Sequence, residues 1–176
     1  ATLSAAFASV GAFSYASAIS KDAGMFQSAL AAANYTVQVR DNTGAAGTVI
    51  AELYDATPAS RFTATTPRLI NVSVLKQIAA DSTLTVGFVT GGSTSMKVLV
   101  RAIGPTLGLA PFNIDGVMAN PNLELFNNAT SASITQNIGW GGSATLTSAF
   151  SAVGAFQLAN AATKDLSLIH ISEPTR

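Results

Sequence analysis

One segment of 22 residues occurs twice in this chain, and its spacing limits the folds that the chain can adopt. Residues 1–22, ATLSAAFASVGAFSYASAISKD, recur without a gap as residues 144–165, ATLTSAFSAVGAFQLANAATKD. Thirteen of the 22 aligned positions are identical, and only five of those are alanine matches. Related segments at a fixed spacing, here 143 residues, are typical of tandem repeats. The sequence therefore predicts a fragment of a repeat array.

The spacing also divides the chain into parts. Residues 1–57 are predicted to be the C-terminal half of one repeat unit, and residues 68–165 the N-terminal two-thirds of the next. Residues 58–67 between them are rich in Pro, Ser and Thr and lack apolar periodicity, which favours a linker. By analogy with the first copy, Asp165 should be followed by the strand-like sequence AGMFQSAL of residues 23–30.

The last eleven residues, LSLIHISEPTR at 166–176, follow the second copy directly. This string resembles the in-frame translation of a transposon-based sequencing adapter, which implies an artefactual tail to be set aside in fold prediction. His170, the only histidine, lies in it, and the chain has no Cys. Residues 1–165 therefore cannot supply a Ser-His-Asp triad, a Cys-His dyad or a histidine-containing metal site. We expect no enzymatic activity, no cofactor and no bound metal.

The composition is low in charge. Charged residues make up 10% of the chain, against roughly 25% in typical soluble domains, and the formal net charge is zero. No basic field is present to attract nucleic acid or an anionic membrane surface. No apolar run reaches the length of about 18 residues that could span a bilayer. Few charges together with many small residues favour a sheet-rich extracellular or cell-surface protein over a cytosolic enzyme.

Alternating apolar residues predict most of the strands. In YTVQVR, Tyr35, Val37 and Val39 share one face of a strand. The sequence DNTGAAG supplies a turn, and TVIAELYD then completes a hairpin over residues 35–55. Five further strands are predicted at residues 68–75, 82–90, 96–103, 122–127 and 133–137.

One helix is predicted, from Leu3 to Val10, with Gly11 as its C-terminal cap. Strands at this spacing with little helix predict an all-β fold, a β-sandwich of jelly-roll or immunoglobulin-like topology with one short N-terminal helix. We further hypothesise that the two parts of the chain close into one sandwich, in which the hairpin at 35–55 pairs with strands from residues 68–137.

Several motifs are distinctive: VLVRAIGPTLG (98–108), NPNLELFN (120–127), WGG (140–142), the repeated VGAF with its Lys-Asp, and the hairpin sequences. Together they resemble a repeat of roughly 140 residues found in very large secreted proteins of environmental bacteria. The resemblance covers nearly all of residues 1–165 and implies export, repetition and a β-sandwich unit. The chain departs from it at Ile138-Gly139, where the family has Asp-Asn before the tryptophan.

Asp41, Asn42 and Asp55 flank the predicted hairpin turn and offer oxygen ligands of the kind that calcium prefers. Their spacing matches no defined calcium loop. Asp and Asn in turns more commonly accept backbone hydrogen bonds. The sequence favours turn chemistry here and leaves calcium as the alternative.

Glu52 and Asp55, with Glu124, are the acids that could form a glycosidase-like pair. Such enzymes need two carboxylates at a controlled separation in a sugar-binding cleft. Strand-edge salt bridges, with Arg40 and Arg101 as partners, are the favoured interpretation.

Trp140, in GWGG, is the candidate ligand-binding residue, because an aromatic face between glycines could stack on a sugar. The favoured alternative is a core plug, in which the glycines let the ring fold over one end of the sandwich.

The sequence thus favours a non-catalytic structural or adhesive repeat module of a large extracellular bacterial protein. Its expected partners are neighbouring repeat units in the same chain and cell-surface or extracellular polysaccharide, with no nucleic acid and no membrane insertion. The alternative is a carbohydrate-binding module of a secreted polysaccharide-degrading enzyme, with Trp140 at its site.

Overall fold

Two compact units, Ala1–Leu75 and Lys76–Arg176, divide the chain. The computed structural model describes residues 3–17, 19–92, 94–137 and 139–172, so Ile138, at which the sequence departs from the repeat that it resembles, lies outside the described residues. The division falls after Leu75, whereas the sequence places the joint at residues 58–67. In the described parts, no helix has the length and apolar character needed to cross a membrane.

Helix α1, Leu3–Val10, opens the first unit as the sequence predicts. Gly11 ends it with a left-handed φ of 72°, and the Ala12 N–H donates a hydrogen bond to the Phe7 carbonyl at 3.0 Å. This bond satisfies one of the carbonyls that a helix end leaves without an intrahelical partner. Glycine suits the position because a Cβ atom opposes a positive φ. A short 3₁₀ helix, Ala59–Arg61, lies within the predicted linker.

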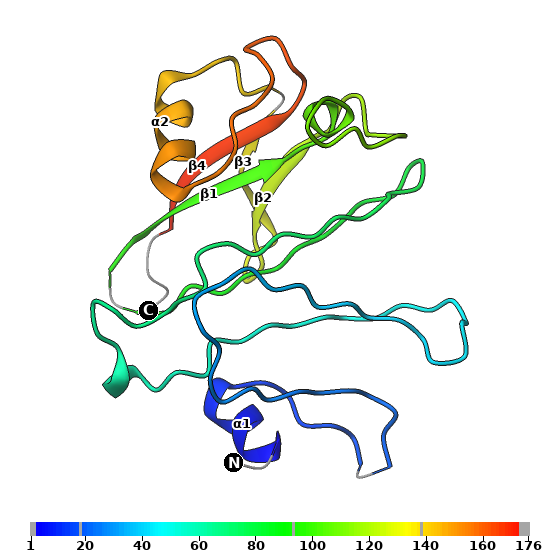
Figure 1. Cartoon of the computed structure of the whole chain (residues 1–176), viewed down its shortest axis with the longest axis vertical. Coiled ribbons are helices and arrows are strands. Elements are labelled where there is room, and N and C mark those ends of the chain that lie inside the picture. The colour runs from blue at the N-terminus through cyan, green and yellow to red at the C-terminus, as the bar shows by residue number, and fades with distance from the viewer. Residues whose placement is uncertain (1–2, 18, 93, 138, 173–176) are drawn as a thin grey trace. The chain divides into compact units, whose positions relative to one another are not determined.

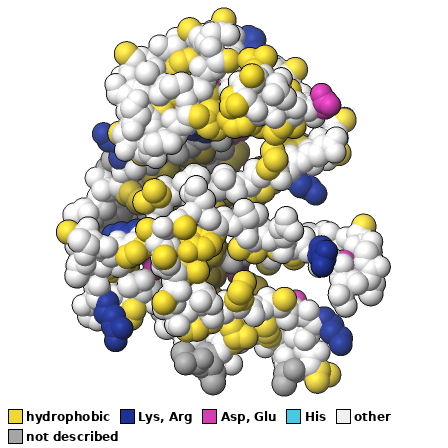
Figure 2. Space-filling model, in the orientation of Figure 1, with side chains coloured by type: hydrophobic (Ala, Val, Ile, Leu, Met, Phe, Trp, Pro, Cys, Tyr) yellow, Lys and Arg dark blue, Asp and Glu magenta, His cyan; other side chains and the backbone are white. Residues whose placement is uncertain are grey.

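The alternating segments at 35–55, 68–75 and 82–90 form no strand among the described residues. They are extended loops (Figure 1), so the four strands predicted in these segments are wrong. The closure of the two parts of the chain into one sandwich stays a prediction. Their large apolar side chains are exposed, Val37 by 67%. Figure 2 shows hydrophobic side chains at the surface of the molecule. Alternation stabilises a strand only where neighbours cover one of its faces, and here that cover is missing. The predicted turn is confirmed, since the Gly44 N–H donates to the Asp41 carbonyl at 3.3 Å.

Three predicted strands of the second unit are confirmed as β1 (Met96–Ala102), β2 (Leu123–Asn127) and β3 (Ala132–Asn137). β2 and β3 form an antiparallel hairpin with a register irregularity between Leu125 and Phe126. β1 pairs antiparallel with a fourth strand, β4 (Leu166–Ser172). The described residues thus hold two α-helices and four strands in two sheets, a small β-rich fold.

Strand β4 lies in the segment that resembles a sequencing adapter. Its register runs from Leu166 opposite Ala102 to Ser172 opposite Met96, and Leu166 is fully buried. An unpaired strand edge is a template for any neighbouring segment that can extend beside it, and this apolar segment follows the second copy directly. The prediction that residues 166–176 take no part in the fold is therefore wrong for residues 166–172. The origin of this segment from a sequencing adapter stays a prediction.

Helix α2, Ala144–Val153, is a second α-helix where the sequence predicts only one. Gly154 ends it with a φ of 69°, and the Ala155 N–H donates to the Phe150 carbonyl at 2.8 Å. The prediction of a single helix is wrong because both copies of the repeated segment carry the helix and its glycine cap.

The core of the second unit forms where α2 packs beside the β1–β4 pair (Figure 1). Leu146 and Phe150 lie four residues apart, so they share one face of α2. The buried members of this core are Trp140, Leu146, Phe150 and Leu158, with Leu99, Ile103, Ala155 and Ile169 packed against them.

Candidate functional site

Asp165 lies fully buried at the end of the second repeat copy. Its Oδ1 accepts a hydrogen bond from the Gly104 N–H at 2.8 Å, and its Oδ2 accepts from the Thr106 N–H at 3.1 Å. The hydroxyls of Thr106 and Thr163 donate to the same Oδ2 at 2.5 and 2.6 Å. A buried carboxylate needs such donors because burial removes its water. Asp165 therefore fastens the turn at Gly104–Thr106 to the segment that enters β4.

The turn that Asp165 holds leads into the 3₁₀ helix η2, Pro105–Gly108. Gly104 has no room for a side chain, since an added Cβ would collide with the carbonyl oxygen of Met118. Thr106 is buried, and its hydroxyl accepts a hydrogen bond from the Ala159 N–H at 3.2 Å while it donates to Asp165. Gly104 and Thr106 of one sequence motif thus contact Asp165 of another.

Arg101, on β1, lies beside this site. Its guanidinium carbon is 4.4 Å from the centre of the Phe150 ring and 4.5 Å from that of Phe156, and its Nη2 donates to the Phe156 carbonyl at 2.8 Å. Burial lowers the pKa of Arg101, and the negative charge of Asp165 opposes that change. Its Nε is buried without a hydrogen-bond partner among the described residues. Arg101 therefore acts as a cation stacked on aromatic rings, in place of the predicted strand-edge salt bridge.

Trp140 is 8% exposed and belongs to the core. The centre of its ring lies 5.9 Å from that of Phe150, with 37° between the planes. The indole N–H donates to the Asn160 carbonyl at 3.0 Å, which satisfies its one polar group. A sugar-stacking platform needs an open ring face, and the indole does not present one here. This placement is that of a core plug.

The candidate calcium ligands serve turns of their own backbone. Asp41 Oδ1 accepts hydrogen bonds from the N–H groups of Thr43 and Ala45 at 2.8 and 2.9 Å, and Asn42 lies within the same turn. The Thr43 hydroxyl bond, followed by these backbone bonds, lowers the pKa of Asp41. Asp55 likewise accepts from the Thr57 N–H at 3.0 Å. In the described part of the chain, no three or more His, Cys, Asp or Glu side chains are grouped so that they could hold a metal ion.

The candidate acid pair is divided between the units, because Glu52 and Asp55 belong to the first and Glu124, on β2, to the second. Glu52 accepts a hydrogen bond from the Tyr54 hydroxyl at 3.1 Å. Partial desolvation, with a smaller contribution from Glu52, raises the pKa of Tyr54. Arg40 is exposed. The glycosidase-like pairing of Glu52 or Asp55 with Glu124 therefore stays a prediction.

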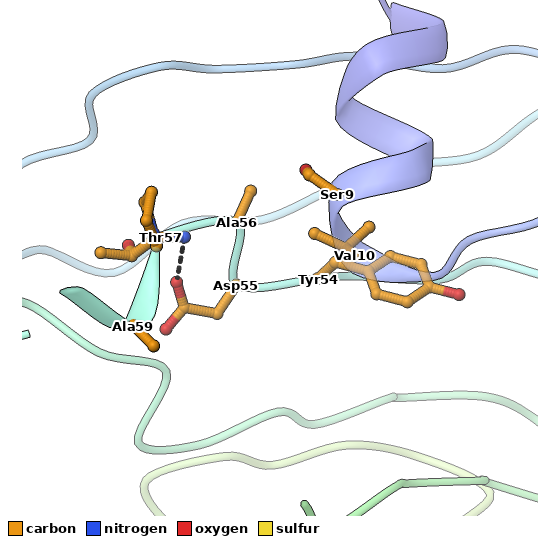
Figure 3. Close-up of a pocket in the computed structure, with 8 residues that line it drawn as sticks. Ser9, Val10, Tyr54, Asp55, Ala56, Thr57 and Ala59 are labelled. Atoms are coloured by element: carbon orange, nitrogen blue, oxygen red, sulfur yellow. Dashed lines mark hydrogen bonds between the residues drawn. The ribbon is translucent and has the colours of Figure 1, made fainter. Parts of the chain in front are cut away.

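A shallow hollow in the first unit lies between the end of α1 and residues 54–59 (Figure 3). Tyr54 and Asp55 are the titratable members of its lining, and the Asp55 carboxylate is bound to the Thr57 N–H. The Ser9 hydroxyl donates to the Ala6 carbonyl at 2.8 Å. These polar groups are engaged by their own segments, so the hollow assembles no nucleophile with a base.

Sequence reasoning misses Gly104, Thr106 and Asp165 as one constellation. The available signal is the Lys-Asp that ends both copies of the repeated segment, together with the Gly-Pro-Thr motif, but nothing local shows that they touch.

No family model matches the chain, and no curated protein or solved structure matches it significantly.

Proposed function

We propose that this chain is a non-catalytic structural or adhesive module of a large extracellular bacterial protein, built from tandem β-sandwich repeats. The main support for the proposal is that residues identical in the two copies have structural roles. In the second copy, Phe150 fills the core, Gly154 caps α2 and Asp165 holds a turn. Residues shared between repeats serve packing and caps here, which suits a module that acts through its number and shape.

An adhesive array needs only weak binding from each unit, because contacts multiplied along one chain raise the overall affinity. The exposed apolar segments at 35–55 and 68–75 are compatible with faces that a completed sandwich would cover, and the β-sandwich topology is part of the proposal. Neighbouring units are then the first partners of each module, and extracellular polysaccharide is the second.

Arrays of one, two and four repeats of this sequence test the proposal. Small-angle X-ray scattering should show a length that grows in proportion to the number of repeats. Binding to bacterial cells or insoluble polysaccharide should rise more steeply than that number. Arrays that neither lengthen nor bind, or that hydrolyse a polysaccharide, would overturn the proposal.

The alternative, a carbohydrate-binding module, depends on Trp140. A single repeat should then bind polysaccharide, and Trp140→Phe, which keeps a smaller aromatic ring in the core, should weaken that binding without unfolding the chain. The burial of Trp140 argues against this outcome. We expect Trp140→Phe to leave any array binding unchanged.

A further inference from the structure

Strand β4 occupies the position that the repeat assigns to another sequence. A spacing of 143 residues aligns Leu166 with Ala23 and Ser172 with Ala29. After its Lys-Asp, the first copy continues with AGMFQSA where the second continues with LSLIHIS. Since β4 pairs with β1 over its whole length, the alignment assigns residues 23–29 to a partner strand of the β1 type.

The apolar positions of the two segments agree where β4 contacts the core. Leu168 is buried, and Ile169 packs against the core cluster. Their counterparts at the 143-residue spacing are Met25 and Phe26, which are also large and apolar. The sequence of the first copy can therefore make the contacts of Leu168 and Ile169, while at the buried Leu166 it offers the smaller Ala23.

Ser167 is the position where β4 fits poorly. The residue is fully buried, and its hydroxyl has no hydrogen-bond partner in the described structure. An unpaired buried hydroxyl is unfavourable because it loses its hydrogen bonds to water. The aligned residue is Gly24, which has no side chain to bury. This position suits the first-copy sequence better than the sequence it holds.

In the first unit, the same segment lacks such a setting. Asp22 is exposed and accepts a hydrogen bond from the Ser20 hydroxyl, whereas Asp165 is buried against a backbone turn. Residues 23–29 form no strand, and Met25 is 79% exposed. Exposed apolar side chains in this strand-like sequence are compatible with a surface that a partner covers.

We propose that the β1 edge is the acceptor site for a strand with the sequence of residues 23–29, the segment that follows Lys-Asp in the repeat, and that β4 stands in for it. The proposal rests on the tandem organisation proposed above. In an array, the aspartate of each unit holds a Gly-Pro-Thr turn of the β1-to-η2 type, and the next seven residues pair with the β1-type strand of the same unit.

The test exchanges the strand within the full chain. One variant replaces residues 166–172 by AGMFQSA, and a matched control carries the same insert with its Met and Phe both changed to Asp. Hydrogen exchange is measured at the β1 amides. Protection in the AGMFQSA variant should stay within about threefold of that in the starting chain, while the control should lose at least about tenfold.

Failure of the AGMFQSA variant to fold, or equal loss of protection in both variants, would overturn the proposal. The measurement involves neither polysaccharide nor an array. A positive exchange result with non-binding arrays would therefore remove the adhesive function alone, and the reverse pattern would remove the strand assignment alone.

Discussion

The two copies of the repeated segment share a local structure. In each, a helix ends at a glycine with positive φ, and the next residue donates a hydrogen bond to the carbonyl of the phenylalanine five residues before it. The distance is 3.0 Å from Ala12 to Phe7 and 2.8 Å from Ala155 to Phe150. Local sequence alone is thus sufficient to specify the helix and its cap.

Their surroundings differ. Phe150 and Asp165 are fully buried, whereas Phe7 is partly buried and Asp22 is exposed. The second copy is preceded by residues 96–143, which supply β1 and the Gly104 turn as partners. Burial therefore depends on a partner segment distant in sequence, and the same 22-residue pattern gives a core in one place and a surface helix in the other.

The largest expected effect comes from the two phenylalanines. Phe150→Ala should lower the free energy of unfolding by about 3–5 kcal/mol, because it empties the centre of the core. Phe7→Ala should cost only about 1 kcal/mol, since Phe7 loses mainly its edge contact with Tyr15. Urea titration of the full chain, followed by circular dichroism and Trp140 fluorescence, measures both. Equal losses would contradict the distinction between the copies.

The two aspartates come next. Asp165→Asn should cost about 2–3 kcal/mol, because the amide places a donor against the donors that the carboxylate accepts from Gly104, Thr106 and Thr163. Asp22→Asn should change the stability by no more than about 0.5 kcal/mol, as is usual at an exposed site. The same urea titration compares them. A large effect at Asp22 would mean that the first copy has a buried partner in solution.

The same division between local and distant causes explains what the sequence predicts. Helix α1 and the Asp41–Gly44 turn depend on neighbouring residues, and both are found where they are predicted. The strands of the hairpin at 35–55 and the strand at 68–75 are predicted from alternating apolar residues and are absent. Alternation shows which face of a strand needs to be covered, but it does not show which segment covers it. The contact of Asp165 with Gly104 spans 61 residues and leaves no periodic signal.

The glycine caps should respond alike in the two copies. Gly11→Ala and Gly154→Ala each place a Cβ on a residue with positive φ, which costs about 1 kcal/mol. Hydrogen exchange at the Ala12 and Ala155 amides should accelerate by about fivefold in the matching variant, because each cap bond opens more often. If exchange accelerates at Ala12 but not at Ala155, packing and not local sequence stabilises the cap of the second copy.

The smallest effect concerns Asp41, whose hydrogen bonds are all local. Its pKa lies below the ordinary value of 3.8, owing first to the Thr43 hydroxyl and then to backbone N–H groups. Because the folded value is lowered, the turn contributes stability above the unfolded pKa and loses it as the pH falls through the folded value.

An NMR titration of the Asp41 carboxyl should show Thr43→Ala raising that pKa toward 3.8, and Thr57→Ala, the matched control, leaving it unchanged. Phe150→Ala should also leave it unchanged, since the turn needs no distant partner. A shift of the Asp41 pKa in that variant would place the turn among the partner-dependent features and weaken the contrast between the two kinds of structure.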